Sequence, residues 1–194
     1  MLVLASASPR RAELLGLLGV AFQVLPADLD ESPYAFERPG PYVERLATEK
    51  AAAVFAMLGR PSDCVVLGAD TTIDLDGAIV GKPTDRADAA AMLRALSGRK
   101  HAVHTGLAIL SAAISKAIVV RTEVEFVALS SARIDWYLAT GEAEGKAGAY
   151  ALQGAGGMFV RGVTGSVSGV VGLPLAELAE LLGILGVSPG GFLG

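Results

Sequence analysis

The segment Ser6-Ala7-Ser8-Pro9-Arg10-Arg11 combines hydroxyl groups, a proline and two arginines where a short apolar strand is expected to lead into a helix. Unpaired backbone N–H groups and the positive dipole end at such a helix start favour an anion. Arginines are electrostatically unfavourable in a first helical turn. A bound triphosphate would resolve that conflict for Arg10 and Arg11, and the alternative is that both guanidinium groups are solvated.

Asp70 is a second candidate, because it follows the apolar run 64–69, which is expected to be a buried strand that ends there. The end of such a strand is the usual edge of a ligand crevice in an open α/β sheet. With Asp76-Gly77 as a two-residue hairpin turn, Thr71 falls opposite Lys82. The carboxylate of Asp70 and the ammonium of Lys82 would then be neighbours, able to hold a metal-bound phosphate or to form an ordinary ion pair.

The loop that follows residue 27 is acidic and contains Asp28, Asp30 and Glu31. Carboxylates suit hard divalent cations, and Mg²⁺ usually takes one or two of them together with phosphate oxygens and waters. A solvated acidic loop without any ligand is the alternative.

The stretch 146–154 is rich in glycine and alanine, so a ligand could approach its backbone closely. Lys146 offers a positive charge and Tyr150 a flat ring. The amide of Gln153 has paired donors and acceptors that suit the edge of a nucleobase. A glycine-rich loop with no ligand is again the alternative.

Three other site types are rejected from the sequence. The segment 77–83 superficially resembles a phosphate-binding P-loop, but its spacing is one residue short and Pro83 replaces the required Ser or Thr. His101 and His104 are three positions apart on an expected strand, so they face opposite sides and cannot chelate together. The chain also lacks the G-x-S-x-G motif of serine hydrolases.

The elements that must position these segments alternate irregularly between strands and helices. No internal repeat or interdomain linker interrupts the 194 residues, and the tail at Pro189-Gly190-Gly191 is expected to fray. This order predicts an α/β fold with a mixed twisted sheet flanked by helices. The expected strands are 2–5, 21–25, 64–69, a hairpin within 71–80, 102–110, 117–127 and 158–160, and the expected helices are 9–19, 41–58, 87–96, 132–139 and 174–182.

Composition excludes several classes of protein. The formal net charge of −4 argues against binding of a nucleic acid polymer, which needs clustered Lys and Arg. The mean hydropathy is high at +0.51, but uncharged stretches are too short to span a membrane. The single cysteine, Cys64, cannot form an internal disulfide. Arg10 and Arg11 follow the first apolar run, the reverse of signal-peptide order, so a cytoplasmic protein without membrane contact is expected.

Nine short blocks, taken together, resemble the Maf family of nucleotide pyrophosphatases, also described as septum-formation-inhibitor-like proteins. They occur in family order between Leu2 and about Leu182. Each block is weak alone, but none is missing. The blocks are Leu4 to Arg11, Asp30-Glu31, Glu49-Lys50-Ala51, Gly68-Ala69-Asp70-Thr71, Gly81-Lys82-Pro83, Leu96-Ser97-Gly98-Arg99, Lys146 to Tyr150, Leu152-Gln153-Gly154 and Val171 to Leu175.

The resemblance implies a two-lobed single domain over 1–194 with a central cleft, similar to inosine triphosphate pyrophosphatases and often dimeric. It implies hydrolysis of dTTP and UTP to the monophosphate and pyrophosphate with a divalent cation (Mg, Mn or Co), for which Glu31 and Asp70 are the expected ligands. Asp70 matches the family's proposed general base. Positions that separate substrate subgroups match Arg10, Thr71 and Gln153, and other family site positions match Ser6, Arg11, Glu31, Lys50, Lys82 and Lys146.

Two alternatives to this reaction remain at the level of sequence. A non-catalytic nucleotide-binding regulator of cell division or septum formation would keep the cationic pocket but would not need Asp70 or the acidic loop. A phosphatase that releases single phosphates could use the same pocket, and the two reactions differ only in their products.

Overall fold

The computed structural model describes residues 1–186, and its centre is one seven-stranded mixed sheet. The strand order is β2-β1-β3-β5-β6-β7, with β4 paired to β3. β1 is parallel to both β2 and β3, and the other pairs are antiparallel. The strands are β1 (Leu2–Ala5), β2 (Phe22–Val24), β3 (Val65–Leu75), β4 (Ala78–Val80), β5 (Lys100–Leu110), β6 (Ser115–Phe126) and β7 (Val160–Thr164).

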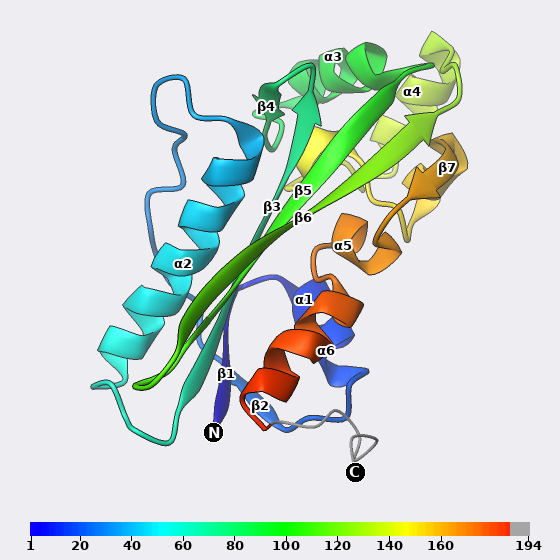
Figure 1. Ribbon diagram of the computed structural model, residues 1–194. Helices are drawn as coiled ribbons and strands as arrows, with labels where there is room; N and C mark the ends of the chain where they lie inside the picture. The colour runs from blue at the N-terminus through cyan, green and yellow to red at the C-terminus, as the bar shows by residue number, and fades with distance from the viewer. Residues whose placement is uncertain (187–194) are drawn as a thin grey trace.

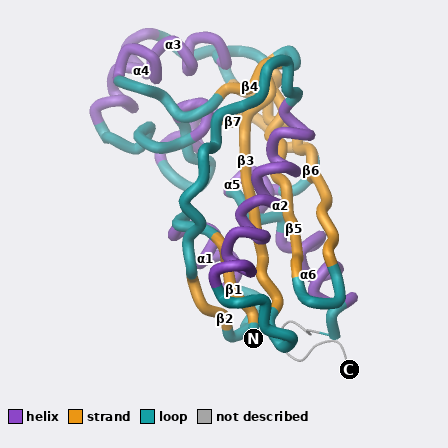
Figure 2. The backbone as a smooth tube through the Cα atoms, turned by 90° about the vertical axis from the view of Figure 1, so that its left-hand side faces the viewer, coloured by secondary structure: helices purple, strands orange, loops and turns teal. Residues whose placement is uncertain are grey.

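Helices flank this sheet, which confirms the expected α/β arrangement (Figure 1). The long helix α2 runs along β3 and β5, while α3 and α4 lie together at one end of the molecule (Figure 2). The helices are α1 (Pro9–Gly16), α2 (Pro39–Met57), α3 (Arg86–Leu96), α4 (Ser131–Ala139), α5 (Val167–Val171) and α6 (Leu175–Ile184), with the short 3-10 helices η1 (Ala147–Ala149) and η2 (Ala155–Phe159).

Three long strands, β3, β5 and β6, pass through both halves of the molecule and form its spine (Figure 1). In one half, which we call the upper lobe, α3, α4 and the two 3-10 helices enclose an aromatic core that contains Phe126, Tyr137 and Phe159. In the other half, the lower lobe, α1 and α6 pack with β1 around Leu4, Leu107 and other aliphatic side chains. Each lobe therefore has its own apolar cluster on a shared sheet.

Two glycines allow α2 to lie unusually close to the sheet. A Cβ at Gly68 would overlap the backbone carbonyl of Ala47, and a Cβ at Gly106 would overlap that of Val43. Because the backbone of the helix touches these strands, the next turn of α2 brings Lys50 against β3, where the side chain is buried.

One prediction near Asp70 is wrong. The strand does not end there, because β3 continues to Leu75. On the hairpin edge the pairing stops at Ile73 and Val80, so Thr71 does not pair with Lys82, and on the opposite edge it pairs with Thr105 of β5. The Asp76-Gly77 hairpin turn is confirmed. On the edge of β3 away from β5, the pairing with β1 ends at Gly68 and the pairing with β4 starts at Ile73. The residues of β3 between them, including Asp70, have no strand partner on this edge, and this gap opens the sheet beside Asp70.

Other expectations are mostly confirmed within a few residues. The expected strand at 158–160 is instead the end of η2 followed by β7, and the short helix α5 was not expected. His101 packs on Phe126, whereas His104 bonds to Asp74, so the two histidines do not meet. The tail at 189–191 lies outside the described residues. Within residues 1–186 no helix is long and apolar enough to cross a membrane.

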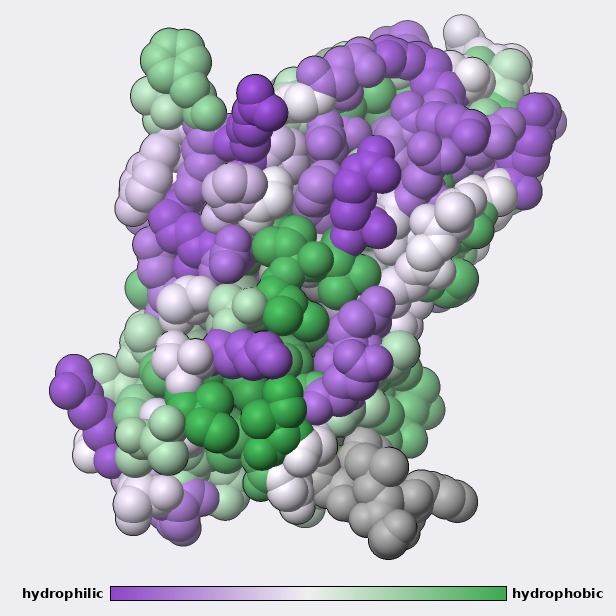
Figure 3. Space-filling model, in the orientation of Figure 1, coloured by the Kyte–Doolittle hydropathy of each residue, from purple (hydrophilic) through white to green (hydrophobic). Residues whose placement is uncertain are grey.

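The surface follows the same division into lobes. On the face shown in Figure 3, hydrophilic residues dominate the upper lobe, and hydrophobic residues gather over the lower lobe near α5 and α6.

Candidate active site

A cavity of about 540 Å³ lies between the two lobes, beside the gap in strand pairing. Its lining comes from the loop after β1, the acidic loop, α2, β3, the segment after β4, the 144–153 loop and α5. All ten site residues that the family resemblance implied line this cavity, although they come from distant parts of the chain, whereas Asp28 and Asp30 of the acidic loop do not line it. The ten residues are Ser6, Arg10, Arg11, Glu31, Lys50, Asp70, Thr71, Lys82, Lys146 and Gln153.

One wall of the cavity carries carboxylates bridged by lysines. The ammonium of Lys50 donates to Oδ1 of Asp70 at 2.6 Å and lies 2.6 Å from Oε1 of Glu31. Lys82 lies 3.4 Å from the other oxygen of Glu31. The cationic partner of Asp70 is therefore Lys50, and not Lys82 as the hairpin register predicted. Oδ2 of Asp70 has no hydrogen-bond partner among residues 1–186 and is not fully buried, so it is open to the cavity.

The lysines control the charge of Glu31. Burial acts to raise the pKa of its carboxyl group, but hydrogen bonds and charge from Lys50, together with Lys82, outweigh burial and leave the pKa below its usual value. Glu31 is therefore a carboxylate at neutral pH, as a ligand for a cation must be.

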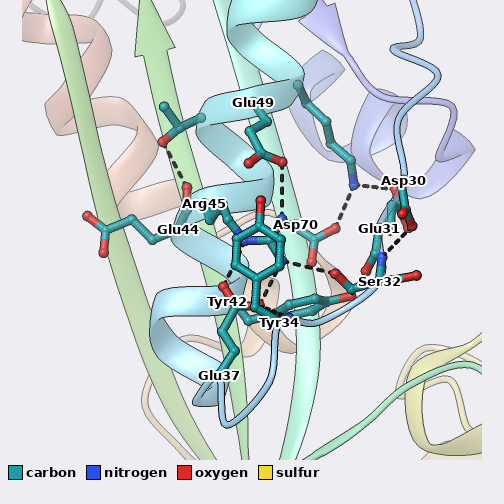
Figure 4. A network of polar contacts seen from close by, with 12 residues as sticks. Asp30, Glu31, Ser32, Tyr34, Glu37, Tyr42, Glu44, Arg45, Glu49 and Asp70 are labelled. Carbon is teal, nitrogen blue, oxygen red and sulfur yellow. Dashed lines mark hydrogen bonds and ion pairs between the residues drawn. The ribbon is translucent and has the colours of Figure 1, made fainter.

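Arg45 of α2 holds the acidic loop in place (Figure 4). Its guanidinium binds both oxygens of Glu37 at 2.7 Å, donates to Ser32 O at 3.2 Å, and lies 3.9 Å from the centre of the Tyr34 ring. The hydrogen bonds to Glu37 are the main reason why the pKa of Arg45 lies above its usual value. One turn earlier on the helix, the hydroxyl of Tyr42 donates to the backbone oxygen of Glu31 at 2.9 Å.

A second wall is basic and is built on the start of α1, next to Asp70 of the carboxylate wall. Ser8 is the N-cap of α1 and Pro9 its first residue, as expected, but the Ser8 side chain does not cap the helix. The Nε of Arg11 donates to Gly172 O at 2.9 Å, and its terminal nitrogens donate to Ser6 Oγ at 3.1 Å and Thr71 Oγ1 at 3.2 Å. Arg11 is therefore a fixed cation, although burial lowers its pKa.

A directed chain of hydrogen bonds continues from Arg11 into the sheet. Thr105 donates its hydroxyl proton to Gly169 O at 2.8 Å. The contact of 3.0 Å between the Thr71 and Thr105 hydroxyls must then have Thr71 as donor, since each hydroxyl has one proton. Thr71 accepts from Arg11 and donates to Thr105, so its proton is already used inside the protein.

Arg10 and Lys146 are cations whose charges are only partly balanced by acidic groups of the protein. Arg10 has no hydrogen bond within the described part of the chain, and burial lowers its pKa while Glu13 partly opposes this. Among residues 1–186 the ammonium of Lys146 donates only to Glu144 O, and burial, followed by the charge of Arg10, lowers its pKa. Two like charges that disfavour each other across a cavity suit a bound anion.

Gln153 lies exposed in the loop between Tyr150 and η2, where it lines the cavity. Tyr150 is buried under the loop, with its hydroxyl 2.9 Å from Nε2 of His101. The amide group of Gln153 has no hydrogen-bond partner within residues 1–186, so it is available to a ligand.

The donor set fits a divalent cation that arrives with a phosphate ligand. The carboxylates of Glu31 and Asp70 converge, since one oxygen of each lies 2.6 Å from the ammonium of Lys50. Within residues 1–186 no group of three or more His, Cys, Asp or Glu side chains is arranged to hold a metal. Mg²⁺ commonly uses one or two carboxylates and takes its other ligands from phosphates and waters.

Sequence reasoning missed four residues that shape this site: Tyr42, Arg45, Thr105 and Glu142. The spacing of Arg45 and Glu49 by four residues is typical of a helical ion pair, which the structure contains, but nothing local in the sequence points to Glu37. Thr105 bonds to Thr71 on the neighbouring strand of the sheet. Glu142 bonds to Tyr137 nearby in the chain and to Ala155, which is 13 residues away. Only tertiary structure could identify them.

Comparisons with known proteins agree on one family. The family model described as Maf-like protein matches residues 1–185. The dTTP/UTP pyrophosphatase of Anaeromyxobacter dehalogenans (strain 2CP-C) is 56% identical over 180 residues, covering 91% of this chain and 89% of that protein. The dTTP/UTP pyrophosphatase of Myxococcus xanthus (strain DK1622) is 54% identical over 177 residues, covering 91% and 88%.

A solved dITP/XTP pyrophosphatase from Mycobacterium abscessus shares 16% identity with this chain, at a TM-score of 0.47 with 95% of each chain covered.

Proposed function

The chain belongs to the Maf-like protein family, and on that premise we propose that it is a nucleoside triphosphate pyrophosphatase that hydrolyses dTTP and UTP. The relatives that share more than half of its residues carry this activity in their names. The products would be the nucleoside monophosphate and pyrophosphate. Removal of unwanted nucleotides from the cytoplasmic pool is the corresponding role.

The observation that carries this proposal is the division of the cavity into a basic and a carboxylate wall. Arg10, Arg11 and Lys146 suit a triphosphate, and the first backbone N–H groups of α1 add donors for it. On the carboxylate wall, Asp70 presents an oxygen with no hydrogen-bond partner among residues 1–186. A phosphate ester held between these walls would place a phosphorus within reach of a carboxylate.

In the proposed reaction a water molecule attacks the α-phosphorus. The new bond joins the water oxygen to that phosphorus, the bond to the oxygen that bridges the α- and β-phosphates breaks, and pyrophosphate leaves with the electron pair. Asp70 orients the water and accepts its proton at Oδ2, while Lys50 holds Oδ1 and so fixes the carboxylate plane. Arg10, Arg11 and Lys146 offset the charge that grows on the leaving group.

Glu31 and Asp70 would hold a divalent cation that enters with the nucleotide. When bound, such a cation acidifies water and neutralises phosphate charge. The internal ion pairs of Lys50 and Lys82 with Glu31 keep the carboxylate wall in place before the nucleotide arrives.

Selection of pyrimidines is assigned to Gln153 and Thr71, in different ways. The amide of Gln153 is free to pair with the edge of a base. The proton of Thr71 is already donated to Thr105, so Thr71 acts by holding Arg11 and by its shape, not as a hydrogen-bond donor to substrate.

The test is product analysis with the purified chain. It would be incubated with dTTP, UTP, CTP, ATP and GTP in turn, each with Mg²⁺, Mn²⁺ or Co²⁺, and both products would be identified. The expected result is monophosphate and pyrophosphate from dTTP and UTP, with loss of turnover in a chelator. Release of orthophosphate would identify the phosphatase alternative, and tight nucleotide binding without turnover would identify the regulator.

A further inference from the structure

Glu142, in the turn after α4, forms the centre of a hydrogen-bond cluster beneath the loop that carries Gln153. Its Oε1 accepts from the Tyr137 hydroxyl at 2.9 Å and from Gly156 N at 2.9 Å, and its Oε2 accepts from Ala155 N at 2.8 Å. The Tyr137 oxygen in turn accepts from Ala151 N at 3.2 Å. Both ends of the segment 151–156 are thus tied to the Tyr137–Glu142 pair.

The charge of Glu142 is part of this arrangement. Burial acts to raise the pKa of its carboxyl group, but hydrogen bonds from Gly156, Ala155 and Tyr137 outweigh burial, and the pKa lies below its usual value. An ionised carboxylate is an acceptor only, so it can take all three donors at once. A neutral amide of the same shape would turn a donor toward at least one of them.

Gly154 shows how tightly the loop rests on this carboxylate. A Cβ built on Gly154 would overlap both oxygens of Glu142. The backbone of Gly154 has φ −108° and ψ −155°, which does not itself demand glycine. A side chain at the residue that follows Gln153 would therefore have to displace the carboxylate of Glu142 from its hydrogen bonds, and would not have to overcome backbone strain.

We propose that Glu142 is a positioning residue that holds the loop 151–156 in one conformation, and thereby determines how Gln153 meets the base of the substrate. Glu142 is not among the residues that line the cavity, so it acts through the loop. This inference rests on the proposed function, because it takes Gln153 to be the residue that recognises the pyrimidine.

The kinetic consequence follows from where Gln153 acts. Contacts to the base are the same in the bound substrate and in the transition state at phosphorus. Loss of such uniform binding raises KM and leaves kcat nearly unchanged. Disorder of the loop should also reduce the preference for pyrimidines, since selectivity depends on a fixed hydrogen-bonding edge.

The first experiment compares Glu142→Gln with the wild-type chain for dTTP and for ATP. The expected result is a rise of roughly ten-fold in KM for dTTP with a change in kcat of less than about three-fold, from loss of charge-assisted hydrogen bonds. The ratio of kcat/KM for dTTP over ATP should fall. Unchanged KM and unchanged selectivity would overturn the proposal.

Glu13→Gln is the matched control, because Glu13 and Glu142 both act on the charge of Arg10. Glu13 is exposed on α1 and makes no side-chain hydrogen bond or ion pair within residues 1–186. If Glu142 acted only through the charge of Arg10, Glu13→Gln would give the same kinetic change. We expect Glu13→Gln to resemble the wild type, and an equal effect of both variants would contradict the positioning role.

A second experiment tests the contact between Gly154 and Glu142. Gly154→Ala should raise KM strongly, because the new methyl group displaces the loop. In a Glu142→Ala background, where the carboxylate is gone, the same change at Gly154 should raise KM much less. Equal effects in both backgrounds would show that the two residues are not coupled.

A third measurement does not need enzymatic activity. In Glu142→Gln the amide protons of Ala155 and Gly156 should exchange with solvent at least ten-fold faster, while those of α3 and the centre of β5 keep wild-type rates. If the wild type proved inactive, the proposed function would fail while this exchange result still decided whether Glu142 orders the loop. Unchanged exchange at both amides would overturn the inference.

Discussion

The ammonium of Lys50 donates to the carboxylate of Asp70 across 2.6 Å, although 20 residues separate them and neither side chain is more than 9% exposed. The contact exists because α2 lies directly on Gly68 and Gly106 of the sheet. It leaves one oxygen of Asp70 bound and the other open to the cavity. The ion pair thus sets the direction in which Asp70 can accept a proton.

Asp70→Asn should abolish most turnover while the fold is retained. The amide oxygen can still accept from Lys50, but the side chain can no longer take a proton from water. We expect kcat for dTTP to fall by roughly 10²- to 10⁴-fold, the range for loss of a general base. Pyrophosphate release would measure kcat, and thermal unfolding would confirm folding.

The matched control for that variant is Asp76→Asn at the β3–β4 turn. Asp76 pairs with Arg99 at the surface, outside the cavity lining, and has φ 56°, which Asn tolerates well. It should keep wild-type turnover. Near-normal kcat in Asp70→Asn would remove Asp70 from its proposed role.

Lys50→Met should destabilise the protein as well as inactivate it. Removal of one partner of a buried ion pair leaves the carboxylate of Asp70 uncompensated and Glu31 paired with Lys82 alone, which costs about 3 kcal/mol in unfolding free energy. Adding Asp70→Asn should recover part of this loss, since the buried charge is then absent. Urea unfolding of the single and double variants measures both effects.

Lys82→Met provides the comparison for stability, because Lys82 pairs with the same Glu31 but its side chain is 63% exposed. Its unfolding free energy should stay within about 0.5 kcal/mol of the wild type. If Lys50→Met were equally mild, Lys50 would not be the residue that compensates the buried charge.

Local features of the fold were predictable from sequence because short-range chemistry determines them. Ser8-Pro9 marked the start of α1, and Asp76-Gly77 marked a hairpin turn that the structure confirms. The strands expected at 102–110 and 117–127 correspond to β5 and β6, which pair as a long hairpin. Such signals depend on residues that are neighbours in the chain.

Tertiary partners were not predictable in the same way. Hairpin register suggested Lys82 as the neighbour of Asp70, but the partner is Lys50, because the packing of α2 across the sheet overrides proximity along the hairpin. Asp70 lies at a crevice as expected, yet the crevice arises where β1 leaves β3 and not where β3 ends. The roles of Arg45 and Glu142 depend wholly on such packing.

Arg45→Lys should weaken the response of the enzyme to divalent cation. Lysine cannot reproduce the bidentate hydrogen bonds to Glu37 or the stacking on the Tyr34 ring. The loop that carries Glu31 would then lose its main attachment to α2. We expect the Mg²⁺ concentration for half-maximal turnover to rise roughly ten-fold, as for other residues that orient a metal ligand.

Arg99→Lys is the control for that change, because its single ion pair with Asp76 is exposed and lies outside the cavity lining. Its metal response should match the wild type. A wild-type metal response in Arg45→Lys, measured by titration of Mg²⁺ at fixed dTTP, would show that Glu31 does not depend on the Arg45 contacts.

His101 should make the protein less stable in mild acid. The residue is 4% exposed, with its ring between those of Phe126 and Tyr150, and burial lowers its pKa from 6.5 to about 4. Between these values the unfolded chain binds a proton that the folded chain does not, so stability falls as pH drops. The loss from pH 7 to pH 4 attributable to His101 is about 3 kcal/mol.

His101→Phe keeps an aromatic ring in the same place and removes the titrating group, along with a ring nitrogen, Nδ1, that is buried without a partner in the described structure. Urea unfolding of both proteins at pH 7, 6, 5 and 4 would measure the difference. The wild type should lose more stability than His101→Phe across this range, with the gap opening below pH 6.5. Parallel curves for the two proteins would mean that His101 titrates alike in the folded and unfolded states.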